Sequence, residues 1–219
     1  MMKNNKKIFN AMLVAIFCFL LVYKLVDAIP TKISRQMQNL QEQKSVNLFE
    51  QNEISQSFKA VSSYLSSINV TVGVGNVQYD DKVDFVLKDE DDNIITEQQI
   101  DVTDFKNGSA YSFEFDPQRD SEGKTYTAYF KGSNSEGESN VYFYISKAAS
   151  YNEGTLLVNN KDVKKDLTFS STYNGGKIAN VKDSLKKLPV NGKMFMVISL
   201  VMAISVILFV YETLNKYDK

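Results

Sequence analysis

The chain has no histidine, no tryptophan, one cysteine and three prolines among its 219 residues. Without histidine it lacks the commonest general base at neutral pH, and the usual zinc ligand sets cannot be assembled. The single cysteine, Cys18, lies in an apolar run and cannot form a disulfide within the chain. The sequence therefore excludes a disulfide scaffold, and no catalytic constellation is visible in it.

Charge is unevenly distributed along the chain, although the whole carries a net charge of only −1. Residues 53–180 contain 20 Asp and Glu against 12 Lys and Arg, a net charge of −8, while the flanks are basic. Nucleic-acid binding needs clustered Lys and Arg for phosphate contacts. We therefore expect no nucleic-acid partner.

The first apolar run, Ile8–Tyr23, follows a leader that carries Lys3, Lys6 and Lys7. Its 16 residues fall short of the roughly 20 that a spanning helix needs, but the run extends to Ile29 if Lys24 reaches the interface. We expect residues 1–30 to form a cytoplasmic leader and a transmembrane helix. The alternative is a signal peptide cleaved after residue 28.

The second apolar run, Met194–Tyr211, has 18 uncharged residues, and we expect residues 194–219 to form a second transmembrane helix with a short cytoplasmic tail. Two spans place both termini on one side of a cell membrane. The basic leader resembles an export signal, which favours an extracytoplasmic central region. Counting charges near the spans alone does not settle this topology.

Residues 31–52 are polar, and Ile33, Met37 and Leu40 are spaced as on one face of a helix. We expect a helical stalk there, or alternatively a flexible tether. Residues 53–61 fit either a helix or a strand.

Short extended segments dominate the centre of the chain. Val83, Phe85 and Leu87 alternate with other residues, an acidic turn follows at 89–93, and Ile94–Thr96 resumes extended sequence, which predicts a hairpin. Further strands are expected at 65–74, 110–115, 124–131, 141–145, 156–158 and 167–169. These segments predict a mainly β protein, an antiparallel β-sandwich over 53–174, with a basic connector at 175–193. Its expected core is Phe58, Ile68, Val70, Val83, Phe85, Leu87, Phe113, Phe115, Tyr126, Phe143 and Phe169.

Several stretches together resemble a bacterial jelly-roll domain: ISQSF at 54–58, YLSSINV at 64–70, VDFVLKDEDDNII at 83–95, YSFEFDPQRDSEGKTYTAYF at 111–130 and LTFSSTY at 167–173. In that family the domain accompanies multi-pass membrane enzymes of cell-envelope polysaccharide assembly. The resemblance implies an extracytoplasmic sandwich similar to carbohydrate-binding modules, and it makes 53–61 a strand. Two spans are too few for a membrane glycosyltransferase, so the resemblance implies a supporting role and no enzymatic activity.

Three groups of residues are candidates for binding. Aromatic rings stack on the apolar faces of sugars, so we consider an envelope glycan as a ligand of the tyrosines Tyr111, Tyr126, Tyr129, Tyr142 and Tyr144. Outward tyrosines also simply suit strand surfaces. Asp89, Asp91 and Asp92 offer oxygens to Ca²⁺, although an acidic turn also serves solubility; we expect no cofactor.

Lys182, Lys186 and Lys187 form a basic group next to the second apolar run, suited to lipid phosphates or to plain anchoring. The expected function is that of a non-catalytic accessory protein of envelope polysaccharide assembly or export. Its partners would be the lipid bilayer, a larger multi-pass membrane protein and an envelope glycan. The alternative is a two-span scaffold that acts through protein contacts only.

Overall fold

The computed structural model describes residues 20, 23, 24, 27, 30–40, 42–50, 52–133, 139–187 and 194. The chain divides into two compact units. One unit is Lys32–Gly175, and it contains every described strand; the other consists of the chain on either side of it.

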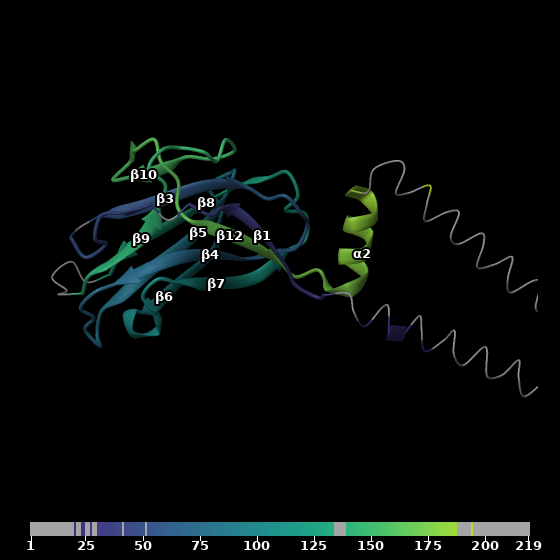
Figure 1. The fold of residues 1–219 in the computed structure, drawn as a ribbon, viewed down its shortest axis with the longest axis horizontal. Coiled ribbons are helices and arrows are strands. Elements are labelled where there is room, and N and C mark those ends of the chain that lie inside the picture. Colours follow the sequence, from purple (N-terminus) through teal and green to yellow (C-terminus); the bar gives the residue numbers. More distant parts are fainter. Residues whose placement is uncertain are drawn as a thin grey trace, which may run out of the picture. The chain divides into compact units, whose positions relative to one another are not determined.

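The strands of the first unit lie in two layers, each an antiparallel sheet (Figure 1). The first sheet has the order β1-β12-β4-β9-β2, and β7 also pairs with β4. Its strands are β1 (Ile33–Gln38), β12 (Phe169–Tyr173), β4 (Leu65–Val74), β9 (Val141–Ile145), β2 (Gln43–Lys44) and β7 (Ser109–Gln118). The mainly β, antiparallel sandwich expected from the alternation of short apolar strands is confirmed.

The second sheet has the order β11-β10-β3-β8-β5-β6. Its strands are β11 (Lys161–Asp162), β10 (Leu156–Val158), β3 (Glu53–Lys59), β8 (Thr125–Gly132), β5 (Lys82–Asp89) and β6 (Ile94–Asp101). The predicted hairpin is β5 with β6, and it ends this sheet because β6 is its edge strand. Asp92 closes the turn in the left-handed region, with φ of 63°. A short 3₁₀ helix, Val102–Asp104, then carries the chain from β6 toward β7.

Alternation along β4 explains how the first sheet contributes to the core. Ile68, Val70 and Val72 are fully buried on its inner face. β4 pairs with β12 through Val70 and with β9 from Val72 onward, so these two strands follow each other along one edge of β4. β7 pairs along the other edge.

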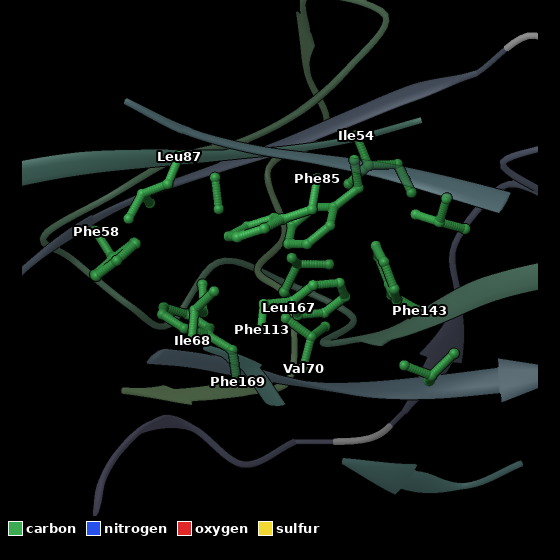
Figure 2. Packing of buried hydrophobic residues seen from close by; sticks show 14 of the residues in the cluster. Ile54, Phe58, Ile68, Val70, Phe85, Leu87, Phe113, Phe143, Leu167 and Phe169 are labelled. Carbon is green, nitrogen blue, oxygen red and sulfur yellow. The ribbon is translucent and has the colours of Figure 1, made fainter. Parts of the chain in front are cut away.

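Phenylalanine rings join the two layers of the sandwich. Phe85 of β5 lies 4.7 Å from Phe113 of β7, and Phe130 of β8 lies 4.8 Å from Phe143 of β9, measured between ring centroids. Figure 2 shows side chains of the second sheet facing those of the first across the core. The expected core is confirmed except at Phe115, which is only partly buried.

The expectation of a helical stalk or tether over 31–52 is wrong. Ile33–Gln38 is strand β1, paired with β12, and Gln43–Lys44 is strand β2, paired with β9. The i, i+4, i+7 spacing predicted an apolar helix face, but its third member, Leu40, is 42% exposed. The buried residues of this segment are instead Leu48 and Phe49, which lie in the core. The backbone of this segment forms hydrogen bonds with the edges of β12 and β9, and these bonds stabilise strands more than the weak apolar periodicity stabilises a helix. The sandwich therefore begins at Lys32 and not at residue 53.

Two further boundaries differ from expectation. The last strand, expected at 167–169, is β12 at Phe169–Tyr173, and Leu167 makes only an isolated bridge to Ile145. The connector expected at 175–193 contains helix α2, Gly176–Lys187.

The two apolar runs, 8–23 and 194–211, lie almost wholly outside the described residues. Within the described part of the chain, no helix has both the length and the apolar character needed to cross a membrane.

Candidate functional site

The outer surface of the first sheet carries the two tyrosines that flank Phe143. Phe143 is fully buried in the core, so Tyr142 and Tyr144 point to the opposite face of β9. Their ring centroids lie 5.9 Å apart. Tyr144 is partly exposed, whereas Tyr142 is only 6% exposed. The pair thus offers one accessible ring supported by a second, largely covered one.

Lys44 of β2 places a cation against this pair. It lies opposite Tyr144 in the register of β2 with β9, and its Nζ is 4.2 Å from the centroid of the Tyr142 ring. A hydrogen bond with the Tyr142 side chain raises the pKa of Lys44 above its ordinary value. This interaction favours the charged form of the Lys44 ammonium group.

Gly73 of β4 makes room for the covered ring. Gly73 is the cross-strand partner of Tyr142, and a Cβ added to it would lie 2.0 Å from Tyr142 Cε2. The absence of a side chain on Gly73 therefore lets the tyrosine ring lie across the neighbouring strand.

Short polar side chains continue the same outer face along β4 and β12. Asn69 Nδ2 donates hydrogen bonds to Ser170 Oγ at 3.1 Å and to Thr172 Oγ1 at 2.9 Å. Ser67 Oγ donates to Asn69 Oδ1 at 3.3 Å. Because β4 and β9 are antiparallel, Tyr144 lies on the Thr71 side of Tyr142 and so toward this polar row. The face combines an aromatic ring, a cation and a row of hydroxyl and amide groups.

The other three predicted tyrosines lie elsewhere. Tyr126 is 3% exposed and stacks on Phe58 in the core, so it must be removed from the predicted glycan contacts. Its hydroxyl has a raised pKa because of burial. Tyr111 is half-buried, with its ring edge-on to Phe105 at 4.8 Å. Tyr129 is partly exposed on the second sheet, with Lys88 Nζ 5.3 Å from its ring centroid. The five tyrosines therefore do not form one platform.

The acidic turn is organised by Asp89. Its Oδ1 accepts hydrogen bonds from the backbone N–H of Asp91 at 3.0 Å and of Asn93 at 2.9 Å, and its Oδ2 accepts one from Asn93 Nδ2 at 3.1 Å. The side-chain hydrogen bond from Asn93 is the main cause of its lowered pKa. Asp92 forms an ion pair with Lys88 at 3.8 Å. Within the described residues, no three Asp, Glu, Cys or His side chains are grouped as metal ligands.

The predicted basic group lies on helix α2. Lys182 and Lys186 are exposed and one helical turn apart, on the same side of the helix. Lys187 is the last residue of the helix, and its side chain lies outside the described part of the structure.

Two exposed residues were missed by reasoning from sequence. Lys44 sits in a polar stretch with no recognisable pattern, and only the pairing of β2 with β9 brings it to the tyrosines. Tyr79 is 87% exposed at a turn in which the Asp81 N–H donates to Gln78 O at 3.3 Å. An aromatic residue inside the polar segment 76–81 was the available signal for Tyr79.

Comparisons with known proteins add little to this geometry. No protein-family model matches the chain, and no curated protein matches it. It is similar to a chain in the solved structure of the infectious bursal disease virus Gx strain, at 9% identity and a TM-score of 0.29. That match covers 65% of this chain and 36% of the viral chain, so this chain spans about a third of its length. A TM-score this low carries no argument about fold or function.

Proposed function

We propose that the protein is a non-catalytic, membrane-anchored accessory protein of bacterial envelope polysaccharide assembly, whose jelly-roll-like sandwich contacts an envelope glycan. The observation that carries the proposal is the outer face of the first sheet, where Lys44 lies 4.2 Å from the ring of Tyr142 beside the accessible ring of Tyr144. The polar row around Asn69 adjoins this pair.

Each part of this face suits a saccharide. A tyrosine ring stacks on the apolar C–H face of a sugar, while hydroxyl and amide groups exchange hydrogen bonds with its hydroxyls. The Lys44 cation favours a glycan that carries carboxylate or phosphate groups. Because Tyr142 is 6% exposed and lies close to both Gly73 and Lys44, its ring has little freedom to lose when a ligand binds, which lowers the entropic cost of binding.

The two apolar runs at the ends of the chain support membrane anchoring. The resemblance to jelly-roll domains of envelope enzymes supports an extracytoplasmic position and a larger multi-pass membrane partner. A binding role agrees with the side chains of the proposed face, since neutral hydroxyls and amides with one lysine suit recognition better than proton transfer.

The proposal is tested by screening the full chain, purified in lipid nanodiscs, against an array of bacterial envelope glycans. We expect binding to at least one anionic glycan, a loss of tenfold or more in Tyr144→Ala, about 1.4 kcal/mol, and a smaller loss in Lys44→Gln. The matched control is Tyr129→Ala, which removes a partly exposed tyrosine beside a lysine on the second sheet. Equal binding by all variants would place any glycan contact elsewhere.

The array also separates this function from a protein scaffold. A chain that binds no glycan but co-purifies with a multi-pass membrane protein through the sandwich would act through protein contacts only. Topology is tested with Tyr79→Cys, because Tyr79 is 87% exposed, in a chain with Cys18 replaced by serine. Labelling of intact cells by an impermeant maleimide is expected, and its absence would place the sandwich in the cytoplasm.

A further inference from the structure

Helix α2 is held to the preceding flank of the chain by one of its faces. Asn180 is 6% exposed, and its Nδ2 donates hydrogen bonds to Pro30 O at 2.6 Å and to Thr31 O at 2.9 Å. Lys177 Nζ donates to Asp27 O at 3.1 Å and to Asp27 Oδ1 at 3.0 Å. The segment that enters the sandwich and the segment that leaves it are therefore fastened together within one compact unit.

The opposite face of α2 carries an exposed aliphatic residue in line with two lysines. Ile178, Lys182 and Lys186 follow each other at i, i+4 and i+8 and so share one side of the helix. Ile178 lies about 200° around the helix from Asn180. Its side chain is 88% exposed, the highest value among the large hydrophobic residues of the described chain.

We propose that this face of α2, defined by Ile178, Lys182 and Lys186, lies on the membrane surface and binds the phosphates of anionic lipid headgroups. Lysine ammonium groups attract an anionic leaflet, and an aliphatic side chain beside them enters the boundary between headgroups and acyl chains. Only residues 188–193 separate the helix from the uncharged run at 194–211, so a bilayer that holds this run lies within reach.

This inference rests on the membrane anchoring of the proposed function and adds a role for α2. Asn180 and Lys177 fix the rotation of the helix, since their side chains hold its other face against Asp27, Pro30 and Thr31. The helix thus presents a defined side to the bilayer.

The test uses the full chain with Cys18 replaced by serine and a spin label on Ile178→Cys. The chain is placed in nanodiscs of phosphatidylcholine alone or of phosphatidylcholine mixed with phosphatidylglycerol. We expect the label at 178 to be shielded from a water-soluble nickel reagent and accessible to oxygen, more so in the mixed bilayer. A label on Tyr79→Cys, at a position that is 87% exposed, gives the fully hydrated reference.

The lysines are tested by the double variant Lys182→Gln with Lys186→Gln. It is expected to remove about half or more of the difference between the two bilayers. Lys106→Gln with Lys131→Gln removes the same charge from exposed positions on the sandwich and is expected to change nothing. If the label at 178 is as accessible to the nickel reagent as the label at 79, in chains that remain in the nanodisc, the proposed role of α2 is wrong. The membrane anchoring of the chain is not affected by that result. A chain that does not enter nanodiscs overturns the anchoring and this inference together.

Discussion

The ring of Tyr142 and the backbone of Gly73 are so close that a Cβ on Gly73 would lie 2.0 Å from Tyr142 Cε2. The two residues are paired across β4 and β9, on the outer face of the first sheet. The Lys44 ammonium group also lies close to this ring, 4.2 Å from its centroid. The glycine therefore determines where the aromatic part of the proposed site lies.

Gly73→Ala is expected to destabilise the protein by about 1–3 kcal/mol, because the new methyl group must displace the Tyr142 ring. Thermal unfolding followed by circular dichroism measures the loss. In the double variant Gly73→Ala with Tyr142→Ser the clash is removed, so the two effects should be strongly non-additive. Simple addition of the two single-variant effects would show that the ring and the glycine do not interact.

Asp166 holds the loop that follows β9. It is fully buried, and its Oδ2 accepts hydrogen bonds from the backbone N–H groups of Ser150 at 2.7 Å and Tyr151 at 2.9 Å. Asp166→Ala leaves both donors without an acceptor and is expected to cost about 2–4 kcal/mol. Asp166→Asn keeps one acceptor oxygen and should cost less. Denaturant unfolding distinguishes the two, and equal losses would mean that the negative charge itself stabilises the loop.

The pKa of the Tyr151 hydroxyl reports on the packing around this side chain. Burial raises its pKa to about 12, and its hydroxyl oxygen accepts a hydrogen bond from the Lys59 N–H at 3.0 Å. Because the folded state raises this pKa from 10.0, the neutral ring contributes stability below pH 10 that is lost as pH rises toward 12. Tyrosinate absorbance against pH should show a late-titrating group that is missing in Tyr151→Phe. If Tyr151→Phe and the unmodified chain have the same titration curve above pH 11, the tyrosine that titrates last is not Tyr151.

The pKa of the Asp89 carboxyl group reports on the structure of the β5–β6 turn. Its pKa is lowered from 3.8, chiefly by the side-chain hydrogen bond from Asn93. A lowered pKa means that its contribution to stability is present above pH 3.8 and is lost as pH falls through the folded-state value. Carboxyl-carbon NMR should show the Asp89 pKa returning toward its ordinary value in Asn93→Ala and staying low in the neighbouring control Asp91→Ala. An Asp89 that titrates normally in the unmodified chain contradicts the role of the turn.

Alternation of apolar residues predicted most of the sandwich. Val83, Phe85 and Leu87 alternate along β5 and are all fully buried, and Phe143 between two tyrosines fixed which rings face outward on β9. The same alternation holds along β8, where Tyr126 is buried on the same face as Ala128 and Phe130. Tyr126 could therefore have been assigned to the core alone.

The remaining features depend on contacts between segments that are distant in sequence. β1 has little apolar alternation, and its strand conformation comes from pairing with β12, more than a hundred residues away. Lys44 reaches the tyrosines only through the two-residue strand β2. The acidic turn, in contrast, is organised by local contacts. The Asp89 carboxylate oxygens, which we expected to be available to Ca²⁺, accept hydrogen bonds from Asp91 and Asn93 within the turn.

The most direct test of the glycan-binding account is calorimetric titration of the full chain in nanodiscs with anionic envelope polysaccharide fragments. The account predicts saturable binding that falls tenfold or more in Tyr144→Ala, about 1.4 kcal/mol, and is unchanged in Tyr129→Ala. Absence of binding to every fragment, or an equal loss in both variants, would contradict it.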